Sequence, residues 1–167
     1  MKPNIPETKY KRVVIIGGGF GGLKLARNLS GKKFQVVLLD KNNYHQFQPL
    51  FYQVATSGLE PSTISFPFRK IFQGNENMHI RITEITSVNP KESYIVSGIG
   101  KIKYDFLVLA TGADTNFYGN SKIREYALPM KSVAEALDIR NRVLENYEKA
   151  LVTEDKDEQL ALMNIVV

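Results

Sequence analysis

The stretch Arg12-Val13-Val14-Ile15-Ile16-Gly17-Gly18-Gly19-Phe20-Gly21-Gly22 decides the fold of this chain. Its first half is a continuous β-branched apolar run, which is typical of a strand buried in a parallel sheet. After the glycine-rich turn, Leu25, Ala26 and Leu29 share one face of an expected helix. A second apolar run, 34–39, ends at Asp40, so residues 12–40 predict a compact βαβ unit.

Three glycines of this turn, Gly17, Gly19 and Gly22, have the spacing G-x-G-x-x-G. Between a strand and a helix, and with an acid after the next strand, this spacing indicates a dinucleotide-binding turn. We expect Gly17 to permit the tight turn, Gly19 to let a pyrophosphate approach the backbone, and Gly22 to let the helix pack closely on the strand. The N–H groups and the positive end of the helix dipole would then face the phosphates. Asp40 is expected to bind a ribose 2′-hydroxyl, as in NAD or the adenosine half of FAD, and to disfavour a 2′-phosphate.

The rest of the chain departs from a simple alternation of helices and strands. A short helix is expected at 67–72, and three strands, 78–88, 92–97 and 101–110, are expected to form an antiparallel meander whose last run re-enters the buried sheet. Ser132 to Glu135 is a capping box that begins a helix, and its apolar stripe Val133, Leu137, Leu144 and Leu151 is interpreted as core. The predicted fold class is therefore α/β: a Rossmann-like domain with a parallel sheet and an inserted antiparallel β-meander, incomplete as it stands.

Composition excludes several classes of function. The chain has 167 residues, a formal net charge of +5, no cysteine and two histidines. These counts exclude disulfide frameworks, Fe–S clusters, thiolate zinc sites and a His-rich metal site within these residues. A modest basic excess without interleaved aromatics argues against nucleic-acid binding. No apolar run approaches the ~20 residues that span a bilayer, and the polar start lacks a secretion signal, so a cytosolic chain is expected.

Two further stretches resemble a known family. Tyr104-Asp105-Phe106-Leu107-Val108-Leu109-Ala110-Thr111-Gly112 is similar to the second FAD signature of flavoproteins with two dinucleotide-binding domains. Residues 40–56 resemble type II NADH dehydrogenases, the single-subunit NADH:quinone oxidoreductases, and so do residues 115–119 and 127–132. The most discriminating part is Gln48-Pro49-Leu50-Phe51-Tyr52-Gln53-Val54-Ala55-Thr56. The resemblance extends from about Lys11 to Val167.

The resemblance implies FAD as the cofactor and NADH as a substrate whose site lies mostly outside this chain. The residues it implies for cofactor binding are Gly17, Gly19, Phe20, Gly21 and Gly22 at the pyrophosphate, Asp40 and Lys41 at the adenosine ribose, Ile85 at adenine, Ala110, Thr111 and Gly112 beside the pyrophosphate arm, and Gln48 and Thr56 near the isoalloxazine ring. No side chain is expected to be catalytic, and His45 is expected to be packed or exposed rather than a base. The resemblance further implies a quinone as partner, peripheral contact with the cytoplasmic face of the inner membrane through a missing C-terminal part, and allows a homodimer.

The expected organisation is a polar tail (1–10), an FAD-binding domain (11–130), a helical connection (131–160) and the first strand of a truncated NADH-binding domain (161–167). Because the sequence stops within an apolar run, we expect an N-terminal fragment that is inactive by itself. Two alternatives stay open: a related reductase of the ferredoxin or rubredoxin type, and a non-catalytic FAD- or NAD-binding module. The absence of cysteine argues against disulfide reductases and sulfide:quinone oxidoreductases.

Overall fold

The computed structural model describes residues 3–166 and divides the chain into two compact units. The first consists of Met1–His45 and Ser65–Ala113, and the second of Gln46–Ile64 and Asp114–Val167. Each unit is therefore built from two separate stretches of the chain. The expected linear boundaries after residues 10, 130 and 160 do not coincide with these units, because residues 46–64 fold with helices that come much later in the sequence.

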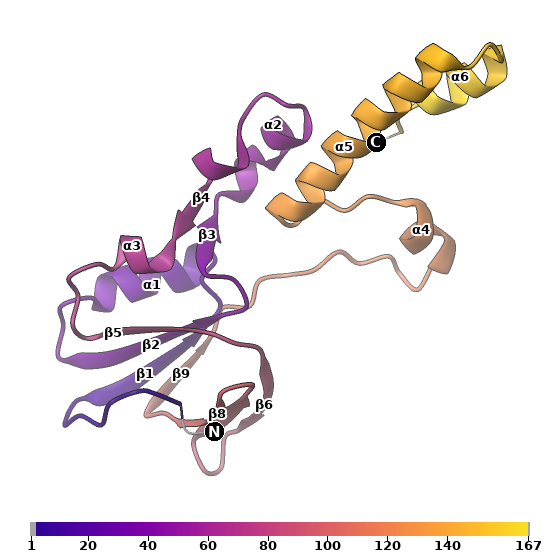
Figure 1. The fold of residues 1–167 in the computed structure, drawn as a ribbon. Helices are drawn as coiled ribbons and strands as arrows, with labels where there is room; N and C mark the ends of the chain where they lie inside the picture. Colours follow the sequence, from indigo (N-terminus) through magenta and orange to yellow (C-terminus); the bar gives the residue numbers. More distant parts are fainter. Residues whose placement is uncertain (1–2, 167) are drawn as a thin grey trace. The chain divides into compact units, whose positions relative to one another are not determined.

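A parallel sheet forms the centre of the first unit (Figure 1). Its strands are β1 (Lys11–Ile16), β2 (Phe34–Asp40), β5 (Met78–Ile82) and β9 (Phe106–Leu109), in the order β5-β2-β1-β9. Helix α1 (Phe20–Leu29) connects β1 to β2. The βαβ unit and its two buried strands are confirmed.

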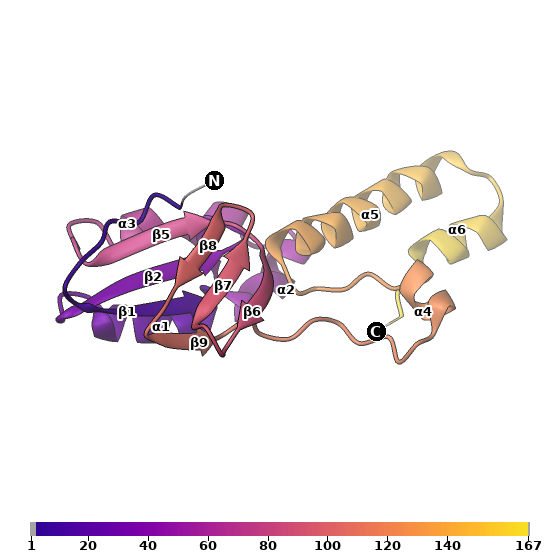
Figure 2. The same cartoon turned by 90° about the horizontal axis from the view of Figure 1, so that it is seen from below.

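The two faces of this sheet are covered by different elements, which explains why its central strands are apolar throughout. Val13 and Ile15 of β1 pack with α1 and with Phe68 of α3 (Phe68–Ile71). Val14 and Ile16 pack on the opposite face with Ile95 and Ile102. These two isoleucines belong to an antiparallel meander of β6 (Ile85–Asn89), β7 (Tyr94–Ser97) and β8 (Gly100–Lys103), which lies over the sheet in Figure 2. The unit therefore has three layers, and the predicted α/β class with its inserted meander is confirmed.

Two of the three strands expected after residue 78 are each divided into two. The run 78–88 forms β5 in the parallel sheet and β6 in the meander, and the run 101–110 forms β8 and β9. At the first division the Thr83 N–H donates to the carbonyl of Asp40, 2.9 Å away, so the chain leaves the sheet beside the end of β2. An uninterrupted apolar run does not show where a strand passes from one layer to another. Since β9 is an edge strand, Phe106 and Leu109 are exposed rather than buried.

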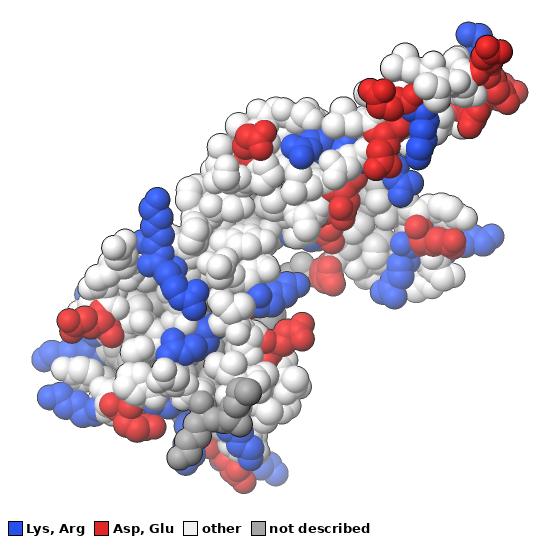
Figure 3. Space-filling view, viewed as in Figure 1, with Lys and Arg blue, Asp and Glu red and all other residues white. Residues whose placement is uncertain are grey.

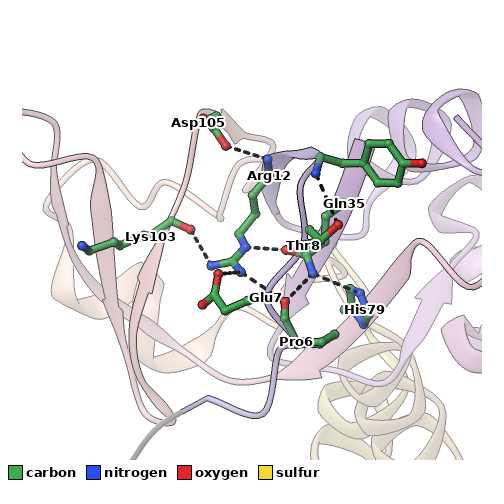
Figure 4. Close-up of polar contacts among 9 residues, drawn as sticks. Pro6, Glu7, Thr8, Arg12, Gln35, His79, Lys103 and Asp105 are labelled. Atoms are coloured by element: carbon green, nitrogen blue, oxygen red, sulfur yellow. Dashed lines mark hydrogen bonds and ion pairs between the residues drawn. The ribbon is translucent and has the colours of Figure 1, made fainter. Parts of the chain in front are cut away.

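A polar network holds the N-terminal segment against the amino ends of the strands (Figure 4). Buried Gln35 accepts a hydrogen bond from Arg12 Nε at 2.5 Å and donates from Nε2 to the carbonyl of Pro6 at 2.7 Å. The same amide nitrogen lies 3.4 Å from His79 Nε2, which acts as the acceptor because an amide N–H only donates. Arg81 donates to the carbonyl of Asn4. The segment expected to be a polar tail is therefore bonded to the sheet from residue 4 onward.

Asp105 fastens the edge strand β9 to β1. Its carboxylate accepts hydrogen bonds from Lys11 Nζ at 2.8 Å and from the Arg12 N–H at 2.7 Å. These two hydrogen bonds lower the pKa of Asp105 below its ordinary value. Asp105, the residue immediately before β9, thus helps to set the position of that strand beside β1.

The second unit is helical. It contains the short 3-10 helices η1 (Gln48–Leu50) and η2 (Pro61–Thr63) and the helices α2 (Phe51–Ala55), α4 (Ser121–Tyr126), α5 (Val133–Val152) and α6 (Lys156–Met163). Phe51, Val54 and Ile64 form its core with Val133 and Ala136 at the start of α5. The short strands β3 (Tyr44–Gln46) and β4 (Ser65–Pro67) pair with each other where the chain passes between the units.

The start of α5 follows the sequence prediction, and its far end does not. The Ser132 side chain accepts from the Glu135 N–H at 3.2 Å, and the Glu135 carboxylate accepts from the Lys131 N–H at 2.6 Å. At this end Val133 is buried. Leu144 and Leu151, however, are 50% and 78% exposed, so the expectation that the whole stripe is core is wrong for them. The first turns of α5 pack on Phe51 and Val54, and near the far end of the helix Ala150 is also buried.

The strand expected over 161–167 is replaced by the end of α6 as far as Met163. The Asp155 side chain caps this helix by accepting from the N–H groups of Asp157 and Glu158 at 2.9 and 3.3 Å. The leucine, alanine and methionine residues at 160–163 are good helix formers, so the capped helix continues through them. Residues 164–166 have no regular structure, and Val167 lies outside the described residues.

Candidate functional site

The glycine turn lies at the carboxyl end of β1, and its first glycine is fixed by backbone geometry. Gly17 has φ +100°, a conformation that side-chain-bearing residues rarely adopt. Its N–H donates to the carbonyl of Leu39 at 2.8 Å. A Cβ on Gly17 would lie 2.2 Å from the carbonyl oxygen of Ala110. Only glycine therefore fits between β1 and the segment that follows β9.

Gly22 is the point of closest approach between α1 and the turn. A Cβ there would lie 1.8 Å from the carbonyl oxygen of Gly17 and 3.3 Å from Ile15 Cγ2. Ala26, one turn later, is fully buried against the same strand. The close helix-on-strand packing expected of this glycine is present.

Gly19 and Gly21 differ from these two glycines because nothing lies beside them. Both are exposed, and no atom lies within 4 Å of a Cβ built on either. Gly19 is the N-cap of α1, where no side chain caps the helix, and the first turn carries no acid. The start of α1 thus presents open backbone and the positive end of a helix dipole. This cradle fits the pyrophosphate of a dinucleotide.

Asp40 lies directly beside this turn. Its Oδ2 accepts from the Gly18 N–H at 2.6 Å, and its Oδ1 accepts from the Asn42 N–H at 2.8 Å. A carboxylate has about four lone-pair sites, so both oxygens keep the capacity to accept from a hydroxyl group. The side chain is only partly buried, and the neighbouring Lys41 is exposed. A ribose fits this position.

The segment after β9 and the start of β6 lie at the same edge of the sheet. The Ala110 N–H donates to the carbonyl of Ile16 at 2.8 Å, which places Ala110 beside the glycine turn. Thr111 and Gly112 follow as exposed residues, and Gly112 has φ +73°. Ile85 opens β6 and packs with the meander-side core, close in sequence to the bond that joins Thr83 to Asp40.

The remaining expected site residues, Gln48 and Thr56, belong to the second unit. Both are exposed, and Thr56 Oγ1 donates to the carbonyl of Tyr52 at 2.9 Å. Between them, Phe51 and Val54 are buried in the core of that unit. The most discriminating stretch of the sequence is therefore also a packing element.

Two residues that sequence reasoning left without a role contact the turn. His45 is 6% exposed, its Nδ1 donates to the carbonyl of Gly18 at 3.0 Å, and its ring meets Phe20 edge-on at 5.2 Å. The buried ring of Phe68 occupies the space beside Gly18, where a Cβ would lie 2.1 Å from Cζ. His45 was expected to be either packed or exposed, and the structure shows that it is packed. A glycine at position 18 was the visible signal for this contact, because the G-x-G-x-x-G spacing places no requirement on that position.

The sequence as a whole matches a family model. The model for pyridine nucleotide-disulphide oxidoreductases covers residues 11–161. The chain belongs to this family. It contains no cysteine.

Individual proteins and solved structures are similar to this chain over most of its length. The type II NADH:quinone oxidoreductase Ndh of Mycobacterium tuberculosis is 32% identical over 99% of this chain and 37% of its own length. The structure of NDH2 from Plasmodium falciparum in complex with NADH has a TM-score of 0.82 and 28% identity, covering 90% of this chain and 32% of its own. The sulfide:quinone oxidoreductase of Aquifex aeolicus has a TM-score of 0.72 and 30% identity, covering 83% and 32%. The resemblance to type II NADH dehydrogenases is confirmed. The chain spans about a third of the length of the curated relatives it matches.

Neither a group of metal ligands nor a membrane-spanning helix occurs among the residues that the structure describes. Within residues 3–166, no group of three or more His, Cys, Asp or Glu side chains is placed to hold a metal ion. In the same part of the chain, no helix has both the length and the apolar character needed to cross a bilayer. On the face drawn in Figure 3, lysine and arginine side chains are interspersed with aspartate and glutamate.

Proposed function

We propose that this chain forms the FAD-binding part of an NADH:quinone oxidoreductase. The observation that supports the proposal is that two glycines of the turn are closely packed while two others lie beside open space. Backbone atoms occupy the space where a Cβ of Gly17 or Gly22 would lie, whereas Gly19 and Gly21 leave open space at the start of α1. The similarity to type II NADH:quinone oxidoreductases supports the choice of reaction.

In this proposal the turn binds the pyrophosphate of FAD. Gly17 shapes the turn, with its own N–H bonded to the Leu39 carbonyl, and Phe20 lines the site at the start of α1. The N–H groups of Gly19, Gly21 and Gly22 and the helix dipole stabilise the two negative charges of the pyrophosphate. The first turn of α1 carries no acid, and the nearby Asp40 carboxylate is bonded to the Gly18 N–H. Ala110, Thr111 and Gly112 line the other side of the turn, since Gly17 touches the Ala110 carbonyl.

The adenosine half lies along the ends of β2 and β6. Asp40 accepts hydrogen bonds from the ribose hydroxyls with the lone pairs that Gly18 and Asn42 leave free, and Lys41 follows it at the surface. The backbone of Ile85 contacts adenine. Gln48 and Thr56, both exposed, lie near the isoalloxazine ring.

Bound FAD supplies the redox chemistry of such an enzyme, in which hydride from NADH reduces the flavin and two electrons pass to a quinone. The residues of this chain bind and orient, and none of them acts as nucleophile or base. The burial of His45 and the hydrogen bond from its Nδ1 to the Gly18 carbonyl support a structural role for this residue. We extend the proposal to a homodimer and to a cytoplasmic location with peripheral attachment to the inner membrane through residues outside this chain.

Titration of the chain with FAD tests the binding site. We expect binding of one FAD, competition by ADP, and much weaker binding of FMN, which lacks the adenosine. Gly19→Val places a side chain in the pyrophosphate position and should weaken FAD by at least about tenfold. Because the space beside Gly19 is empty, the variant should remain folded. Equal affinity of Gly19→Val and wild type for FAD would contradict the pyrophosphate assignment.

The reaction is tested in a longer protein that contains this chain. We expect NADH oxidation with a quinone as acceptor, and none by residues 1–167 alone. Turnover with a ferredoxin or rubredoxin but not with a quinone would instead indicate a reductase of that type. Nucleotide binding without any NADH oxidation would indicate a non-catalytic module.

A further inference from the structure

Gly18, the central residue of the three consecutive glycines, is held by side chains from three separate elements. Asp40 at the end of β2 accepts its N–H at 2.6 Å. His45 in β3 donates from Nδ1 to its carbonyl at 3.0 Å. Phe68 in α3 closes the space beside its Cα. The N–H of Gly18, its carbonyl and the space beside its Cα are therefore each in contact with a different side chain.

The hydrogen bond from His45 is internal and directional. The imidazole is 6% exposed and is packed edge-on against Phe20, so water does not compete freely for its Nδ1. A carbonyl oxygen only accepts, so Nδ1 carries the proton in this contact. The neutral Nδ1–H tautomer and the imidazolium both satisfy this requirement.

The consequence reaches Gly19 through the geometry of the peptide bond. The carbonyl of Gly18 and the N–H of Gly19 belong to one planar trans peptide, so they point in opposite directions. A bond that fixes the Gly18 oxygen therefore fixes the direction of the Gly19 N–H. Two adjacent glycines otherwise have the greatest backbone freedom of any residue pair, so this peptide needs an external restraint.

We propose that His45 is a positioning residue for dinucleotide binding. By holding the Gly18 carbonyl, it presents the Gly19 N–H to the pyrophosphate, in the open space at the start of α1. The inference rests on the proposed function, because it needs a phosphate-bearing ligand at this turn. It assigns to His45 neither a contact with the ligand nor a proton transfer.

Three variants separate the hydrogen bond from the packing of the ring. His45→Leu fills the buried position with an apolar side chain and removes the hydrogen-bond donor. His45→Asn restores a donor, because asparagine Nδ2 and histidine Nδ1 are both attached to Cγ. His45→Gln moves the donor one bond further from the backbone. His79→Asn is the matched control, since His79 contacts Gln35 at the opposite end of the strands.

The measurement is the affinity of the chain for FAD, and for ADP and adenosine by competition, together with thermal unfolding of the ligand-free variants. We expect His45→Leu to weaken FAD and ADP by about tenfold or more, the scale of one oriented hydrogen bond to a charged group. Adenosine, which carries no phosphate, should bind all variants equally. His45→Asn should stay within about threefold of wild type, His45→Gln should fall between Asn and Leu, and His79→Asn should bind FAD as wild type does.

The outcomes distinguish the two levels of the argument. If wild type does not bind FAD, the proposed function fails and this inference fails with it. If wild type binds and His45→Leu binds equally well, only the positioning role is refuted. If His45→Leu does not fold, the order Asn tighter than Gln decides, and the reverse order or equal affinities would overturn the proposal. Equal weakening of adenosine and ADP would assign His45 to packing alone.

Discussion

The substitution of alanine at Gly22 and at Gly19 should separate the folding role of the glycine turn from its binding role. At Gly22 the new Cβ would lie 1.8 Å from a backbone oxygen, where an ordinary contact needs about 3.5 Å. The start of α1 must therefore move away from the turn by more than 1 Å, roughly the difference between the two distances. The clashing atom belongs to the backbone, so no side-chain rotation relieves it.

The magnitude follows from two opposing effects. Overpacking of this kind destabilises by up to about 3 kcal/mol, and alanine in a helix gains about 1 kcal/mol over glycine. The net loss for Gly22→Ala is then about 2 kcal/mol, which lowers the melting temperature of a unit of roughly 90 residues by about 8–16 °C. At Gly19 no atom lies within 4 Å and φ is −65°, so Gly19→Ala should change the stability by no more than about 1 kcal/mol.

Thermal unfolding of the ligand-free chain, followed by circular dichroism, and FAD titration well below the transition measure the two effects. Gly22→Ala should unfold at a clearly lower temperature. Gly19→Ala should unfold near wild type but bind FAD more weakly. A Gly22→Ala variant as stable as wild type would refute the close packing of α1 on the turn, and an equal loss of stability in both variants would refute the open space at Gly19.

Three other perturbations test separate parts of the structure. Asp40→Asn removes the charge that faces the ribose and should weaken FAD by about 1–2 kcal/mol in a titration, whereas unchanged affinity would point to another ribose ligand. Burial, with the nearby Arg81 and Arg12, lowers the pKa of His79, so the folded state prefers neutral His79. Its contribution to stability is therefore complete above the unfolded pKa of about 6.5 and is lost as the pH falls through the folded value, which urea unfolding between pH 5 and 8 should show and His79→Gln should diminish. Ser132→Ala removes the side-chain cap of α5 and should destabilise the second unit by about 1 kcal/mol in the same assay, while Ser121→Ala, one residue past an Asn120 cap, should have little effect.

The sequence was sufficient to predict the central βαβ unit because burial on both faces leaves a strong pattern. Val13 to Ile16 alternate between the helical layer and the meander layer, so every position of the strand must be apolar. The glycine spacing was equally informative, since each of Gly17 and Gly22 is required by a backbone contact that no other residue permits. Such features can be predicted because they depend on residues that are close together in the sequence.

Contacts between distant residues account for what could not be predicted. The donor that holds Gly18 comes from His45, and nothing in the local pattern around either residue specifies the pair. The divided strands 78–88 and 101–110 carry apolar residues in both halves. In the first run Ile80 packs in the helix-side core and Ile85 in the meander-side core, and in the second run Ile102 and Leu107 both pack in the meander-side core. On α5 the apolar spacing continues to Leu151, but Leu144 and Leu151 are exposed while Ala150 is buried, so the predicted stripe does not coincide with the buried face along the whole helix.

The construction of the second unit from two separated stretches has a consequence for synthesis on the ribosome. The Gln46 side chain accepts from the Val133 N–H at 2.8 Å, across 87 residues of sequence. At a translation rate of roughly 5–20 residues per second, the stretch 46–64 emerges roughly 4–17 s before its helical partner exists. Phe51 and Val54 remain uncovered during that interval, on a chain whose parallel strands can already pair. The nascent chain thus exposes a short apolar segment for seconds before the start of α5 can cover it.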